Sequence, residues 1–138
     1  MNNNKGLYII IVEWLMLIIG MILHFNYHVG KIFYGIDIVR PGADGTISVM
    51  SYVLKNVFYH LPMIFILLLL YINNSKFRLA MFVVSIIYSF YHLTHLLKEI
   101  NSAEFNWAQF PLLTIVLIIS LCLNKSSWDY YKLALERD

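Results

Sequence analysis

Five histidines are the residues of this sequence best suited to chemistry, and their spacing is uneven. His24 and His28 are four residues apart, His92 and His95 are three apart, and His60 stands alone. On a helix, residues three or four positions apart project from the same face. Neutral imidazole is a preferred ligand of zinc, copper and iron. The pattern therefore predicts a metal or haem site built from histidines on several helices.

The elements that must position these histidines are transmembrane helices. Of the 138 residues, 60% are hydrophobic and only 13% are charged, which is about half the charged fraction of a soluble domain. The apolar residues form long runs, each near the roughly 20 residues that a helix needs to cross a bilayer. We expect a single all-α domain over residues 1–138, an integral membrane four-helix bundle. Its helices are predicted at about 7–28, 50–72, 77–97 and 107–123, followed by an interfacial tail at 124–138.

Lysines and arginines in short loops favour the cytoplasmic side, and their distribution predicts that both termini lie there. The basic residues predicted on that side are Lys5, Lys76, Arg78, Lys125, Lys132 and Arg137. Those predicted on the other side are Lys31, Arg40, Lys55 and Lys98. The connections at 29–48 and 99–106 are then extracytoplasmic, and the first is long, with a turn-rich segment at 40–45. The membrane expected is a bacterial-type inner (cytoplasmic) membrane.

The first and third helices run in the same direction, so both histidine pairs are expected at the extracytoplasmic face. The depth of His60 depends on where the second crossing begins. If it begins at Val49, His60 lies about 16 Å deep, and if it begins at Asn56, His60 lies roughly 6 Å deep, at 1.5 Å per residue. The second start is favoured, because Lys55 prefers the membrane interface.

With that start, three helices each contribute one histidine to a common layer. His24, His60 and His92 are predicted to bind the cofactor, and His28 and His95 form a second layer nearer the surface. All five histidines are therefore candidate metal ligands. Other polar residues on the same helix faces are predicted to orient the imidazoles. They are Asn56, Tyr88, Glu99 and Gln109.

Glu13 is a further intramembrane polar residue. Such groups are costly in lipid and normally face the interior of a bundle. Glu13 lies about 16 Å from His24 along the helix axis, which is too far to bind the same ion. We expect it to join a proton path or to pair with a polar group such as Tyr71.

The cofactor stays open between a metal ion, which is zinc, copper or iron, and haem b. A zinc ion held by three imidazoles implies hydrolysis, because a fourth position is left for water. Copper implies metal handling or oxidation. Haem b needs two axial histidines on different helices at similar depth, and His24 with His92, or His60 with either, meets this requirement. Gly20, one turn below His24, would leave room for a porphyrin edge. Haem implies electron transfer with a quinone or a neighbouring redox subunit.

A second class of function involves no chemistry. A short bundle with aromatic-rich helices is also typical of an accessory or structural subunit of a larger membrane complex, in which the histidines are interhelical hydrogen-bond partners. A small transporter is disfavoured, because the sequence has neither repeated halves nor paired broken helices. A net charge of +2 with no basic cluster gives no case for binding nucleic acid. The expected partners are the lipid bilayer and other membrane subunits, and the sequence leaves open whether the chain is an enzyme.

Overall fold

The computed structural model describes residues 3–39, 42–101 and 106–136, and every regular element within them is helical. In chain order the elements are α1 (Asn3–Gly30), the 3-10 turn η1 (Lys31–Tyr34), α2 (Val49–Lys55), the π turn η2 (Asn56–His60), α3 (Leu61–Tyr71), α4 (Ser75–Ile100) and α5 (Gln109–Leu135). The elements α2, η2 and α3 follow one another without a break, and we call them together the second span. By length and composition, four stretches can cross a membrane: Lys5–Tyr34, the second span, α4 and α5. The prediction of an all-helical chain with four apolar spans is confirmed at this level.

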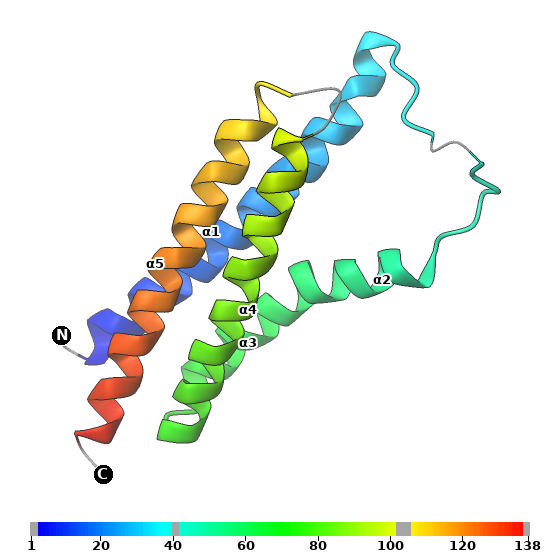
Figure 1. Cartoon of the computed structure of the whole chain (residues 1–138). Coiled ribbons are helices and arrows are strands. Elements are labelled where there is room, and N and C mark those ends of the chain that lie inside the picture. Colours follow the sequence, from blue (N-terminus) through cyan, green and yellow to red (C-terminus); the bar gives the residue numbers. More distant parts are fainter. Residues whose placement is uncertain (1–2, 40–41, 102–105, 137–138) are drawn as a thin grey trace.

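The helix directions define two ends of the molecule (Figure 1). Helices α1 and α4 run the same way and α5 runs the opposite way. We call the end where α1 and α4 finish the histidine end, and the end where both chain termini lie the termini end. Helix α5 continues unbroken to Leu135, so the residues expected to form an interfacial tail extend that helix to the termini end. Arg40, Pro41 and Arg137, which entered the loop and orientation predictions, lie outside the described residues.

Small side chains line the contact between α4 and α5. Ser85 and Ser89 of α4 and Ser120 and Ser127 of α5 are all buried. Asn124 reinforces this contact, since its Nδ2 donates a hydrogen bond to Oγ of Ser89 at 2.9 Å. In lipid, helices associate through close packing and interhelical hydrogen bonds rather than through the hydrophobic effect. The serines therefore explain why these two helices pair along their length.

Helix α1 packs against α5 on a glycine and fills the core with a tryptophan. A Cβ atom added to Gly20 would lie 2.4 Å from Cγ2 of Val116 on α5, so only glycine permits this approach. Trp14 is fully buried, with its ring centroid 5.0 Å from that of Tyr88 on α4. Helices α1, α4 and α5 thus form a tightly packed core.

The second span leans on this core without joining it fully. Only 17% of the residues in its most apolar stretch are buried within the chain, against 39% for α1 and 33% for each of α4 and α5. Near its middle, Phe65 packs on Trp14 with 5.5 Å between ring centroids. Closer to the histidine end, Phe58 packs on Tyr91 of α4 with 4.2 Å between centroids, and α2 then diverges from the other helices (Figure 1). The architecture is therefore a core of three helices, α1, α4 and α5, against which the second span is tilted.

The π turn in the second span has a visible cause and consequence. Pro62 has no N–H group to donate to the preceding turn, which weakens regular α-helical bonding just before it. The N–H of Leu61 bonds to the carbonyl of Asn56, five residues back, instead of to that of Val57. The carbonyl of Val57 is thereby released, and the hydroxyl of Tyr88 on α4 donates a hydrogen bond to it. The irregular turn is thus tied to the core.

A buried arginine holds the termini end together. Arg78 is only 3% exposed, and its Nη1 donates a hydrogen bond to the carbonyl of Tyr130 at 2.7 Å. Its guanidinium carbon lies 3.6 Å from the centroid of the Tyr130 ring, and Nη2 donates to Oδ1 of Asn73. In the same turn, Asn74 caps α4 by accepting a hydrogen bond from the N–H of Phe77 at 2.8 Å. One side chain therefore links the α3–α4 turn to α5.

The connection between η1 and α2 is mostly exposed. Gly35 ends η1 with a φ of 72°, a left-handed conformation that glycine adopts without strain. Further along, Oδ1 of Asp44 accepts hydrogen bonds from Oγ1 and the backbone N–H of Thr46, at 2.6 and 2.9 Å. These hydrogen bonds hold the pKa of Asp44 below its ordinary value. Short local turns of this kind shape the connection in place of helix or strand.

Candidate functional site

Three imidazoles meet at the histidine end. The ring of His24 lies edge-to-face against His28, with 4.7 Å between centroids, and edge-to-face against His95, with 4.6 Å between centroids. His24 and His28 come from α1 and His95 comes from α4, so these rings bridge the two helices. The predicted pairs therefore do come together, because parallel helices bring their matching ends to one level.

His92 lies one turn deeper than His95 on α4 and is only 2% exposed. Its ring centroid lies 5.8 Å from that of Phe58 and 6.2 Å from that of Tyr88. It is also close enough to interact electrostatically with both His24 and His95. We call His24, His28, His92 and His95 the histidine cluster.

Several buried ring nitrogens of this cluster have no hydrogen-bond partner among the described residues. They are Nδ1 of His24, Nδ1 and Nε2 of His92, and Nδ1 of His95. Buried polar atoms in native proteins are nearly always bonded to protein, water or a ligand. The unpaired ring nitrogens at this end of the molecule could therefore bind a group that accepts or donates a hydrogen bond, or a metal ion.

His60 lies apart from the cluster. Its side chain is exposed on the second span, and its Nδ1 lies 2.7 Å from Oδ1 of Asn56, which accepts the hydrogen bond. Asn56 also donates from Nδ2 to the carbonyl of Tyr52 at 3.0 Å. Asn56, one of the residues predicted to orient the imidazoles, thus bonds to His60, while the structure does not bring His60 to His24 and His92.

The other residues predicted to orient the imidazoles have separate positions. Tyr88 is buried beside His92, but its hydroxyl bonds to the second span. Glu99 is near enough to interact electrostatically with both His28 and His95. Gln109 is 1% exposed at the start of α5, and its Oε1 has no hydrogen-bond partner in the described part of the chain. Glu99 is therefore the one best placed to act on the cluster.

A groove of about 360 Å³ opens beside the cluster, between α1, α4 and the second span. Helices α1 and α4 line it with His24, His28 and His95, and the second span lines it with Lys55 and Phe58. The divergence of α2 from the core creates this opening. Three of the four clustered histidines are therefore reachable from outside the protein.

The cluster is not assembled as a finished metal site. Among the residues that the structure describes, no three His, Cys, Asp or Glu side chains already converge in a geometry that holds a metal ion. The edge-to-face rings make van der Waals contact with one another instead. Binding an ion would require the rings of His24, His28 and His95 to rotate so that their nitrogens share one point.

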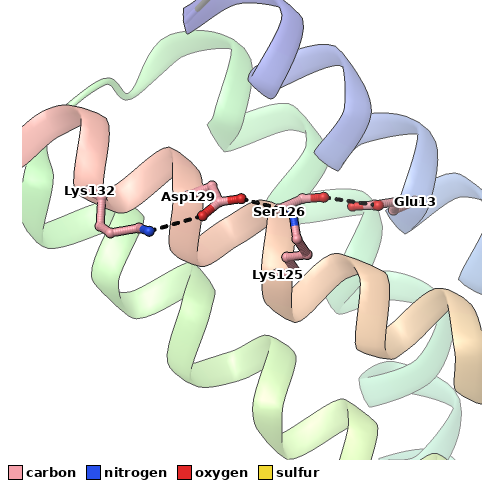
Figure 2. A network of polar contacts seen from close by, with 5 residues as sticks. All are labelled: Glu13, Lys125, Ser126, Asp129 and Lys132. Atoms are coloured by element: carbon pink, nitrogen blue, oxygen red, sulfur yellow. Dashed lines mark hydrogen bonds and ion pairs between the residues drawn. The ribbon is translucent and has the colours of Figure 1, made fainter. Parts of the chain in front are cut away.

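Glu13 lies in the other half of the molecule and takes part in a separate network (Figure 2). Its Oε1 accepts a hydrogen bond from Oγ of Ser126 on α5 at 3.0 Å. One residue earlier on α5, Lys125 begins a chain of ion pairs in which Asp129 lies 3.2 Å from both Lys125 and Lys132. Tyr71, the partner suggested by the sequence, is 79% exposed. The carboxyl of Glu13 therefore packs on α5 and not on the second span.

Comparisons with protein-family models, with curated proteins and with solved structures found no match to this chain. The case for a function therefore depends on the residues and their arrangement alone.

Sequence reasoning missed two parts of the site. Lys55 was used only to locate the membrane interface, yet it lines the groove opposite the histidines. Phe58 and Tyr91, whose rings pack together at a tilt and line the groove, were not singled out at all. The signal available was the π-turn sequence before Pro62, because π turns are frequent at functional sites.

Proposed function

We propose that the histidine cluster binds a transition-metal ion, and that the protein carries out a redox or metal-dependent function in the membrane. The observation that supports this most is the contact of three imidazoles, from two helices, at the edge of an open groove. Imidazole is a ligand for zinc, copper and iron. His24, His28 and His95 would be the ligands, and His92 would lie directly behind them.

Glu99 would orient the ligands of such an ion. Histidines that bind metals usually donate their second ring N–H to a carboxylate or carbonyl, which fixes the ring and makes it a stronger ligand. Glu99 interacts with both His28 and His95, so it can serve this purpose for either ring. Three imidazoles would leave a fourth position facing the groove for water or a substrate.

Haem b is the less favoured cofactor. Axial nitrogens on opposite faces of the iron are about 4 Å apart, since each metal–nitrogen bond is roughly 2 Å. His24 and His95 touch edge-to-face, so this pair leaves no space for a porphyrin plane between its rings. Of the axial pairs predicted from the sequence, those with His60 are not formed, because His60 lies apart from the cluster. The space expected beside Gly20 is filled by Val116. A haem would therefore need a larger rearrangement than an ion.

We further propose that both termini lie in the cytoplasm, so that the groove opens toward the extracytoplasmic side of a bacterial-type inner membrane. The basic residues predict this orientation, because Lys76, Arg78, Lys125 and Lys132 lie toward the termini end. The metal would then exchange with the extracytoplasmic space rather than with the cytoplasm.

An accessory role in a larger membrane complex is the second candidate. The supporting observation is the low burial of the second span, of which 17% of the most apolar stretch is covered by the rest of the chain. Apolar helices that are poorly covered by their own chain can pack on partner helices. In this role the histidines would tolerate replacement.

Metal analysis together with a visible spectrum of the detergent-purified protein separates these candidates. We expect a stoichiometric metal ion in the wild-type protein. The double variant His24→Ala with His95→Ala should lower the affinity for the ion by more than roughly 100-fold, which is the loss expected when only residues that support the ligands are changed. His60→Ala is the matched control, because it removes an exposed histidine outside the cluster.

Equal metal content in the double variant and the wild-type protein would falsify the proposed site. A Soret band in the wild-type protein that is lost in the double variant would show that the cofactor is haem and not a single metal ion. A wild-type protein that takes up neither supplied metal nor haem would leave the accessory role as the better account.

A further inference from the structure

The groove beside the histidine cluster has two chemically different kinds of lining residue. The polar ones are the three histidines, Lys55 and Ser51. The others have carbon-rich side chains and are Met21, Phe25, Leu54, Phe58, Tyr59 and Tyr91. A ligand that covers both linings must have a polar head and an apolar body, because burying apolar surface is favourable while buried polar groups need partners.

One border of the groove is formed by an exposed, mainly apolar helix. Helix α2, which borders it, departs from the three-helix core (Figure 1). Apart from Ser51 and Lys55, the side chains of α2 are mainly apolar and exposed, as at Val49, Met50 and Val53. Surfaces of this composition in a membrane protein are covered by acyl chains. A molecule already dissolved in the bilayer can therefore reach the histidines sideways, without crossing water.

The charges around the cluster favour an anionic head. Lys55 lines the groove, Lys31 interacts with His28, and Lys98 interacts with His95. Two carboxylates oppose them: Glu99 beside the same histidines, and Asp37, which lines the neighbouring cavity of about 490 Å³ together with His28. Among these five described residues the charges sum to plus one, and a bound divalent cation would make the sum more positive.

From these three features we propose that the groove binds a phospholipid with an anionic headgroup, whose phosphate lies between Lys55 and the metal centre and whose acyl chains follow α2. This inference names the ligand class of the proposed metal centre and therefore rests on that function. Phosphate oxygens suit both an ammonium donor and a transition-metal ion. Free phosphate shares this chemistry but makes no use of the apolar lining.

Native mass spectrometry of the zinc-loaded protein in neutral detergent tests the inference. The probes are short-chain phosphatidic acid, short-chain phosphatidylcholine and inorganic phosphate. We expect the protein to retain phosphatidic acid in preference to the other two. Lys55→Gln should weaken that retention about tenfold, as expected for the loss of a charge-assisted bond. Lys76→Gln, which removes an exposed lysine at the termini end, should leave it unchanged.

A second variant, Ser51→Trp, fills the groove from the exposed first turn of α2. It should abolish retention while zinc uptake persists, and that uptake shows that the variant is folded. The inference is overturned if phosphatidylcholine or inorganic phosphate binds as well as phosphatidic acid, or if Lys55→Gln and Lys76→Gln behave alike. Zinc uptake without any lipid preference overturns the lipid inference alone. A protein that takes up neither zinc, copper nor iron overturns the proposed function as well.

Discussion

The two ends of the helical core differ in how fully their buried charged and ring groups are bonded. At the termini end, Arg78 is buried but bonded to both Tyr130 and Asn73. Glu13 accepts a hydrogen bond from Ser126 at Oε1, while its Oε2 has no partner among the described residues. At the histidine end, the buried ring nitrogens have no partners among the described residues, and a groove opens beside them. Unpaired polar atoms reduce stability, whereas paired ones fix helices in place. The contrast indicates that the termini end serves stability and that the histidine end is arranged for a ligand.

The largest expected effect comes from Arg78→Ala. The substitution removes two hydrogen bonds of a charged donor and a cation–π contact, which together contribute about 2–4 kcal/mol. We expect the free energy of unfolding, measured by SDS titration in mixed micelles, to fall by that amount. Lys76→Ala, at an exposed position two residues away, should change it by less than about 0.5 kcal/mol. Similar losses in both variants would show that the termini end does not carry the stability assigned to it.

A smaller effect is expected from Tyr88→Phe, which removes the hydroxyl that bonds to the Val57 carbonyl. The loss of this hydrogen bond should cost about 1 kcal/mol. It should also speed amide hydrogen exchange in η2, because the π turn would lose its tie to α4. Tyr71→Phe is the control, since that hydroxyl is on an exposed side chain of the same span. Unchanged exchange in η2 would mean that the second span is held by packing alone.

The smallest effect on stability is expected from His92→Leu. Leucine has a similar volume and no polar atoms, so it removes two unpaired buried nitrogens without opening a large cavity. We expect the free energy of unfolding of the metal-free protein to stay the same or to rise by up to about 1 kcal/mol. Metal affinity should nevertheless fall, by about tenfold, because His92 lies behind the proposed ligands. A loss of stability above about 2 kcal/mol would contradict the contrast between the ends.

The helical architecture was predictable because lipid leaves few alternatives. A chain with four long apolar runs must satisfy its backbone hydrogen bonds within each run, and this requires helices. The meeting of His24 and His28 with His95 also follows from simple rules, since helix spacing and the number of crossings place both pairs at one end. These inferences use only distance along the chain.

The position of His60 was not predictable by the same means. The distance along the sequence gives the position of His60 along the helix axis. It does not give the direction in which the His60 side chain points. That direction depends on the π turn at Asn56–His60 and on the tilt of the second span, both of which arise from tertiary contacts. The partner of Glu13 was missed for a related reason. Ser126 lies beyond the predicted end of the fourth span, and α5 continues past that point as a helix.

The π turn also sets the angular position of everything before it in the second span. A turn with one residue more than an α-helical turn shifts the helix phase, and each residue of an α-helix corresponds to a rotation of about 100°. If the same residues formed a regular α-helix without the π turn, α2 would be rotated by about that angle relative to α3. Lys55 would then point away from the histidines, although the chain would keep every side chain that lines the groove. The one extra residue held in this π turn therefore determines which face α2 presents to the groove.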